Sequence, residues 1–195
     1  AGFVLLIFCH EMGHYFAAKK IGLDVGAPMF IPFVGAWIAL KEQPLNAKDE
    51  AYIGIAGPFV GTIAACLCYF WARMNESNLF LAISYAGFFI NLFNLIPLPP
   101  FDGGRITAAI SRKMWFIGAP LLIAMFLWRP SPILILMVIL AAPHIWSALR
   151  NKGNTEYYDV PFSKRIEYAL LYFGLLIYLS VMSSNVHDML SSVSR

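Results

Sequence analysis

Charged side chains are scarce in this sequence. Asp, Glu, Lys and Arg make up 13% of its 195 residues, against about 25% in an average soluble domain. Hydrophobic residues make up 59%. This balance excludes a water-soluble globule and indicates a polytopic membrane protein. The net charge of +3 is too small to indicate a nucleic-acid partner, and we expect none.

Cysteine is also rare. Cys9, Cys66 and Cys68 lie in apolar segments, at spacings that match neither a disulfide framework nor a Cys-x-x-Cys site. We interpret all three as small core residues. Cys9 precedes His10 and could be considered a metal ligand, but it points about 100° away around a helix, which disfavours that role.

The sequence also lacks an initiator methionine, since it begins with Ala1, and no basic stretch precedes its first apolar run. A cleavable signal peptide would have such a stretch. We therefore expect the chain to be a fragment or a processed product, with an upstream helix missing.

What the first apolar run does contain is the sequence Cys-His-Glu-Met-Gly-His at positions 9–14. His10 and His14 lie one above the other on a helix face, close enough to share a metal. Glu11 is the usual partner that takes a proton from a water molecule on that metal. Such a match can arise by chance in a soluble protein. In a membrane span, however, each charge near the centre costs about 2.5–3.5 kcal/mol on insertion scales. The run therefore indicates metal chemistry, provided that a third ligand exists.

The apolar runs predict an all-α polytopic membrane protein with about six transmembrane helices. Residues 24–40 are apolar but short for a span, and they combine prolines and glycines with residues that favour strands. We interpret them as a re-entrant or interfacial β-hairpin between the first two helices, with its backbone satisfied by itself or by neighbouring protein. The expected helices cover residues 1–20, 51–71, 79–95, 114–128, 133–149 and 166–182, and polar loops cover 41–50 and 150–165.

A second polar stretch follows the third helix. Prolines at 97, 99 and 100 forbid a continuing helix, and Asp102 before two glycines fits the N-cap of a short helix through Arg112. By this point the chain has returned to the face that holds His10 and His14. Asp102 can therefore be both a cap and the third ligand.

The basic residues predict the depth and orientation of the metal. Lys19 and Lys20 mark a membrane interface, which places His10 about 13 Å below it in a hydrocarbon core about 30 Å thick. If the hairpin re-enters the membrane without crossing it, eleven Lys and Arg residues lie on the metal side of the membrane and three on the other side. If the hairpin crosses the membrane, the two sides hold nine and five. The positive-inside rule favours the first, with the metal-side loops in the cytoplasm. The eleven are Lys19, Lys20, Lys41, Lys48, Arg105, Arg112, Lys113, Arg150, Lys152, Lys164 and Arg165; the three are Arg73, Arg129 and Arg195.

The two remaining histidines are not expected in the site. His144 lies near one end of its helix, where we favour a packed or interfacial histidine over a ligand. We assign no role to His187 in the tail.

Three stretches, taken together and in this order, resemble the site-2 protease family of intramembrane zinc metalloproteases. They are residues 10–14, the Ala-Gly-Pro at 56–58, and the run Asn-Leu-Ile-Pro-Leu-Pro-Pro-Phe-Asp-Gly-Gly at 94–104. The resemblance covers about the first 112 residues. It implies a metalloprotease core of three helices and a re-entrant β element in residues 1–113. Outside the motifs, the apolar runs predict additional transmembrane helices in 114–195, and the basic residues predict that the loop at 150–165 is cytoplasmic.

The resemblance also implies the site. One Zn²⁺ per chain would be bound by His10, His14 and Asp102, with Glu11 as general acid and base. Asn94 would lie near the substrate or the developing oxyanion, and the sequence leaves open whether Asn91 takes that place.

The function implied is a zinc metalloendopeptidase that hydrolyses transmembrane substrates near the cytoplasmic face, as in regulated intramembrane proteolysis. The expected partners are a membrane-spanning protein substrate, the lipid bilayer and a regulatory membrane protein. The expected location is a multi-pass position in a membrane, with the active site towards the cytoplasm. Compactness favours a bacterial plasma membrane. No stretch is long or polar enough for the PDZ or CBS modules of some family members.

Two other functions remain open from the sequence. Intramembrane His, Glu and Asp residues also line ion pathways, so the chain could be a metal-ion transporter. Against this, the polar residues cluster towards one face and no second cluster follows. The alternative of an inactive homologue that binds membrane clients is disfavoured because Glu11 and all three candidate ligands are present.

Overall fold

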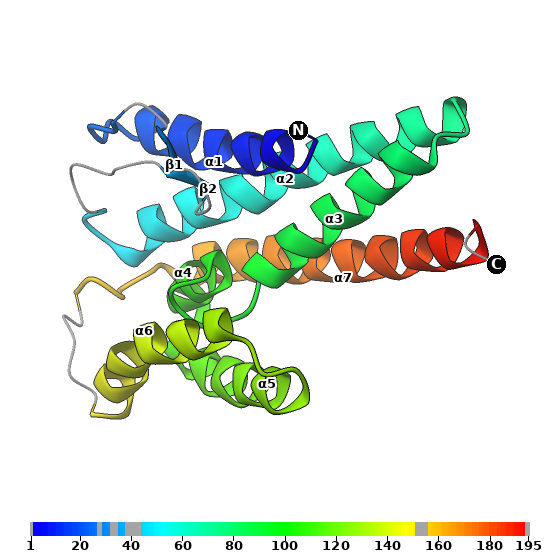
Figure 1. Cartoon of the computed structure of the whole chain (residues 1–195). Coiled ribbons are helices and arrows are strands. Elements are labelled where there is room, and N and C mark those ends of the chain that lie inside the picture. The colour runs from blue at the N-terminus through cyan, green and yellow to red at the C-terminus, as the bar shows by residue number, and fades with distance from the viewer. Residues whose placement is uncertain (1, 27–28, 32–34, 38–43, 151–155, 194–195) are drawn as a thin grey trace.

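The computed structural model describes residues 2–26, 29–31, 35–37, 44–150 and 156–193. This part of the chain is mostly helical and contains one two-stranded sheet (Figure 1). In chain order the elements are α1 (Gly2–Lys20), β1 (Met29–Ile31), β2 (Gly35–Trp37), α2 (Ala47–Met74), α3 (Asn78–Asn94), α4 (Asp102–Ile110), the 3₁₀ turn η1 (Arg112–Met114), α5 (Trp115–Trp128), α6 (Pro132–Leu149) and α7 (Phe162–Val193).

Helix α2 is the centre of the fold, because α1, α3 and α4 all pack against it, while α7 packs along α3 and α4 (Figure 1). Small residues permit these close approaches. A side chain at Gly13 of α1 would overlap the carbonyl group of Ala56 in α2, and one at Gly87 of α3 would press on Ala65 and Leu6. The backbones of α1 and α2 are therefore in direct contact beside the two histidines.

The strands β1 and β2 pair antiparallel, with Met29 opposite Trp37 and Ile31 opposite Gly35. β2 packs against α1. The pairing lies within the segment predicted as a hairpin, of which residues 27–28, 32–34 and 38–40 lie outside the described part. The re-entry of this segment into a membrane stays a prediction.

Helices α5 and α6 form a separate antiparallel pair beside the other helices (Figure 1). The pair is attached through the segment before α4 and through α4 itself. The indole N–H of Trp115 donates to the carbonyl oxygen of Gly104 at 2.9 Å, and a side chain at Gly118 would press on the carbonyl of Pro97.

Three of the described helices are long and apolar enough to cross a membrane, namely Ala47–Met74, Pro132–Leu149 and Phe162–Ser192. The predicted membrane protein is thereby supported, whereas a total of about six spans stays a prediction. α3 is apolar but has 17 residues. α5 has 14, which at ~1.5 Å per residue is shorter than the hydrocarbon core.

Of the expected boundaries that differ from the structure, two have a clear physical cause. α2 begins at Ala47, inside the predicted polar loop, because the side chain of Asn46 accepts a hydrogen bond from the backbone N–H of Asp49 and caps the helix. The last helix continues to Val193 through most of the predicted polar tail, because its apolar face keeps packing with Leu179 and Val186 buried. A polar composition is therefore compatible with helix as long as one face stays covered.

The start of α2, the end of α4 and the start of α7 lie together, and basic residues are found on all three helices there. Ala47 donates its backbone N–H to the carbonyl of Tyr157, and the Tyr157 hydroxyl donates to Glu50 at 2.6 Å. Burial and this hydrogen bond raise the pKa of Tyr157, which keeps the hydroxyl protonated as a donor. Arg105 pairs with Glu50 from the other side at 3.9 Å. The loop before α7 is thereby fastened to the start of α2.

Candidate metal site

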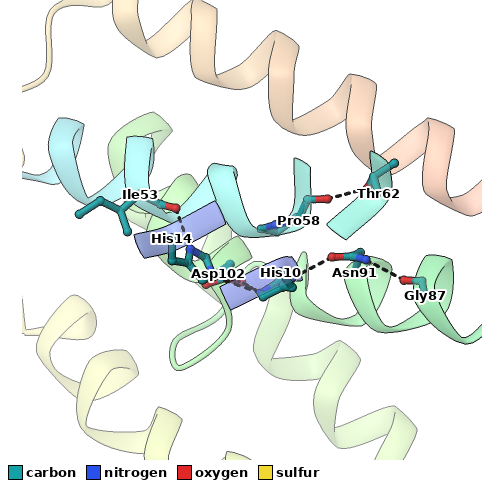
Figure 2. Close-up of polar contacts among 8 residues, drawn as sticks. All are labelled: His10, His14, Ile53, Pro58, Thr62, Gly87, Asn91 and Asp102. Atoms are coloured by element: carbon teal, nitrogen blue, oxygen red, sulfur yellow. Dashed lines mark hydrogen bonds and ion pairs between the residues drawn. The ribbon is translucent and has the colours of Figure 1, made fainter. Parts of the chain in front are cut away.

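Three predicted ligands, far apart in the sequence, converge on one point (Figure 2). The Nε2 atoms of His10 and His14 lie 3.1 Å apart, and they lie 3.0 and 3.2 Å from Oδ2 of Asp102. All three side chains are at most 11% exposed. The predicted third ligand is therefore within reach of the two histidines.

Small residues shape the space around His14. A side chain at Gly57 of α2 would overlap its imidazole ring. The Ala-Gly-Pro motif at 56–58 thus has a local explanation, since only a glycine at its centre leaves room for the imidazole ring. Together, Gly57 on α2 and Gly13 on α1 allow the two helices to approach this closely.

The Nδ1 atoms of both histidines point away from the point of convergence and have partners of their own. Nδ1 of His14 donates to the backbone carbonyl of Ile53 at 2.8 Å. Nδ1 of His10 lies 2.8 Å from Oδ1 of Asn91, whose Nδ2 donates to the carbonyl of Gly87. Because a carbonyl oxygen only accepts, each neutral imidazole keeps its proton on Nδ1 and presents an unprotonated Nε2.

This proton arrangement tests whether the site fits a metal. In the neutral imidazoles, two unprotonated nitrogens and one carboxylate oxygen face one another without a hydrogen between them, and a metal cation at that point would offset the repulsion of their lone pairs. Tetrahedral zinc, with bonds of about 2.0–2.2 Å, places neighbouring ligand atoms roughly 3.3–3.6 Å apart. The observed separations of 3.0–3.2 Å are close to that range. The residues fit a zinc ion.

The segment before α4 determines where Asp102 lies. It packs so closely on the start of α4 that a side chain at Gly103 would overlap the carbonyl of Leu95, and one at Gly104 would overlap Pro99. The prediction that Asp102 is the N-cap is wrong. Phe101 occupies that position without a side-chain cap, and Asp102 is the first residue of the helix. Its carboxylate faces the two histidines and does not cap the free backbone N–H groups at the start of α4.

Glu11 is half-buried on α1 between the two histidines. Its carboxylate is close enough to His10, His14 and Asp102 to interact with them electrostatically. It is not part of the converging group. Its carboxylate therefore lies beside the candidate ligands without being one of them.

The two asparagines of α3 differ. Asn91, left open by the sequence, is 2% exposed and holds Nδ1 of His10. Asn94 ends α3 and is half-buried, and among the described residues no hydrogen bond joins it to the three ligands. Sequence reasoning missed both Asn91 and the Ile53 carbonyl as partners. The one available signal was the position of Asn91 one turn before Asn94.

Cys9, His144 and His187 are not part of the converging group. Cys9 is a free thiol and is absent from the converging group. His144 packs edge-on against Trp115, with ring centres 6.0 Å apart. His187 lies beside Tyr85, with ring centres 5.6 Å apart.

Comparison with known proteins agrees with this arrangement. Residues 1–77 match Peptidase family M50. The chain is 34% identical over 121 residues to "Zinc metalloprotease MJ0392" of Methanocaldococcus jannaschii, a match that covers 58% of this chain and 35% of that protein. It is 26% identical over 134 residues to "Putative zinc metalloprotease MJ0611" of the same organism, covering 58% of this chain and 70% of the other.

The chain thus matches only about a third of the length of the first relative. Residues 1–77, which match the family model, contain the histidine motif and the Ala-Gly-Pro motif, the first two of the three stretches that carry the resemblance. The predicted resemblance to the site-2 protease family is therefore confirmed as a match: residues 1–77 match the model of Peptidase family M50, and both relatives are named as zinc metalloproteases.

Proposed function

We propose that this chain is the catalytic part of an intramembrane zinc metalloprotease that hydrolyses peptide bonds of membrane-spanning proteins near the cytoplasmic face. The observation that carries the proposal is the convergence of His10, His14 and Asp102, with both imidazole protons on the far nitrogens, beside Glu11. The family match and the apolar helices support it.

Each residue has a role in this reaction. His10, His14 and Asp102 would hold the zinc ion and leave a fourth position open. When bound, zinc would supply Lewis acidity, which lowers the pKa of a water molecule towards neutral. Glu11 would act as the general base towards the attacking water and as the general acid towards the leaving amine. Asn94, at the end of α3, donates to the substrate carbonyl as negative charge develops on its oxygen.

A substrate helix hides its carbonyl groups in its own hydrogen bonds and has to unwind before it is cut. The β1–β2 pair could bind the unwound stretch of the substrate as an additional strand. Among the described residues the sheet has two strands, so each strand has one edge that pairs with no other described strand, and β2 packs against the helix that carries the histidines. An extended substrate can pair with such an edge. If deletion or proline scanning of residues 30–40 left cleavage of a membrane substrate unchanged, this part of the proposal would be refuted.

The orientation follows from the basic residues. Lys48, Arg105 and Arg165 lie at one end of the structure, where α2, α4 and α7 meet. By the positive-inside rule, that end faces the cytoplasm. The site lies near that end, since the Asp102 ligand begins the same short helix that carries Arg105.

The test uses the full chain in lipid vesicles with a reporter that has one apolar helix, interrupted by an Asn-Pro pair near its cytoplasmic end. We expect zinc-dependent cleavage of this reporter by the wild type. We expect Glu11→Gln to abolish cleavage and to keep about one zinc per chain, because Glu11 is not a ligand. Zinc flux into the vesicles without peptide products would overturn the proposal in favour of a transporter. Cleavage that survives Glu11→Gln would refute the assigned mechanism.

A further inference from the structure

The last helix, α7, packs along the two elements that precede and contain Asp102 but is not itself part of the metal site. Nothing in the sequence motifs assigns it a role. Two of its side chains, Tyr172 and Arg165, nevertheless form hydrogen bonds with the backbone at the two ends of the α3–α4 segment.

At the first end, the hydroxyl of Tyr172 donates to the carbonyl oxygen of Leu95 at 2.7 Å. Tyr172 is 2% exposed and Leu95 is fully buried. Leu95 caps the C-terminus of α3, where carbonyl groups lack a partner within the helix. The same carbonyl is the group that a side chain at Gly103 would overlap. Tyr172 therefore fixes the surface on which the residue after Asp102 rests.

At the second end, the guanidinium of Arg165 donates to three carbonyl groups. Its Nη1 donates to Ile110, the last residue of α4, at 3.2 Å. Its Nε donates to Val160 at 2.9 Å and its Nη2 to Tyr158 at 3.2 Å. A rigid fork of donors of this kind fixes a helix end more firmly than a single hydrogen bond can. α4 is thus held at its C-terminus while Asp102 occupies its N-terminus.

We propose that Tyr172 and Arg165 are positioning residues for the metal site: α7 holds α4 against the end of α3 so that the Asp102 carboxylate reaches the two histidines of α1. The inference rests on the proposed zinc site. It gives the last helix a part in metal binding although it supplies no ligand. Fixing the helix that carries a ligand contributes to metal affinity, because less conformational freedom is lost when the metal binds.

The chain provides a matched control for Tyr172. Tyr168 lies one turn earlier on α7 and also donates its hydroxyl to a backbone carbonyl, that of Lys48 in α2, at 3.0 Å. Tyr168→Phe keeps the packed ring and removes one part-buried hydrogen bond from the same helix, and that bond goes to α2 and not to the α3–α4 segment. Any general weakening of α7 packing affects both variants.

The experiment measures zinc affinity of the purified full chain by competition with a chelator, together with thermal unfolding of the metal-free protein. We expect Tyr172→Phe to weaken zinc binding about two- to tenfold, as the loss of one net hydrogen bond predicts. We expect Tyr168→Phe to leave zinc affinity unchanged. In an Asp102→Ala background, Tyr172→Phe should have no further effect on the affinity for zinc.

Arg165→Gln is the second variant, and we expect it to weaken zinc binding in the same direction as Tyr172→Phe. Equal zinc affinity in wild type, Tyr172→Phe and Arg165→Gln would overturn the inference. So would an equal loss in Tyr168→Phe, or a loss that persists in the Asp102→Ala background. Because the readout is zinc affinity and not cleavage, a protein that binds zinc but cuts no reporter would refute the proposed function and leave this inference standing.

Discussion

Two regions of this molecule place a histidine in an apolar helix, with opposite results. In the α1–α4 region, His10 is 5% exposed, and both ring nitrogens have polar partners on other helices. In the α5–α6 pair, His144 is exposed and touches the edge of Trp115. The first region buries asparagine, aspartate and threonine among its helices, whereas the buried residues of the second are apolar or small.

The difference shows that the partners of a histidine, more than the residue itself, make a metal site. His10 needs an acceptor on Nδ1 to expose an unprotonated Nε2, and that acceptor, Asn91, lies 81 residues away in the sequence. The imidazole of His144 could bind a metal equally well by itself. Among the described residues, however, no hydrogen-bond acceptor is found at either of its ring nitrogens.

Removing the carboxylate of Asp102 should have the largest effect on the difference between the His10 and His144 regions. We expect Asp102→Ala to weaken zinc binding by more than about 100-fold, because even the loss of an outer-shell partner weakens it about 10- to 100-fold. His144→Ala should leave the zinc content unchanged. Elemental analysis of the purified variants beside the wild type measures both. Retention of full zinc by Asp102→Ala would show that Asp102 is not a ligand.

Removing the acceptor of His10 tests the role of partners directly. We expect Asn91→Ala to weaken zinc binding about 10- to 100-fold, since the tautomer and the ring orientation of His10 are no longer fixed. Asn94→Ala is the matched control on the same helix. It should keep the zinc affinity and lower only the rate of cleavage. Chelator competition and the reporter assay distinguish the two variants, and equal zinc affinities in both would contradict the assignment of Asn91.

Closing the space around His14 should have an intermediate effect. We expect Gly57→Ala to destabilise the protein by about 1–3 kcal/mol, because the new methyl group overlaps the imidazole and one helix must move. Gly174 in α7 has nothing within 4 Å of an added methyl group. Gly174→Ala should therefore be neutral, or stabilising by up to about 1 kcal/mol. Unfolding titrations in mixed micelles measure both, and an unperturbed Gly57→Ala protein would refute the close packing of α1 on α2.

The smallest expected effect concerns the link between the two regions. Trp115→Phe removes the hydrogen bond to Gly104 and should lower stability by about 0.5–1.5 kcal/mol, with zinc affinity unchanged. The same unfolding and competition measurements apply. A clear loss of zinc affinity would show that the α5–α6 pair also positions the ligands, and the two regions would then be less independent than we infer.

The apolar runs and their breakers predicted the order of the helices and most of their limits. They failed where local signals are ambiguous. Asp102 has the composition of an N-cap, but its carboxylate is used by the histidines instead. The polar tail after residue 182 continues as helix because its apolar face stays covered. In both places a tertiary contact outweighed the local preference of the residue.

The sequence by itself determined that His10 and His14 share a face with Glu11 beside them, because the period of a helix brings residues four apart together. It also determined that the surroundings are apolar. The third ligand, Asp102, was also predicted from the sequence, but only the tertiary structure brings it, 92 residues beyond His10, within reach of the histidines. Only the tertiary structure shows that Asn91 and the Ile53 carbonyl set the imidazole protons. These contacts join different helices, and no local rule of spacing connects residues that meet only through helix packing.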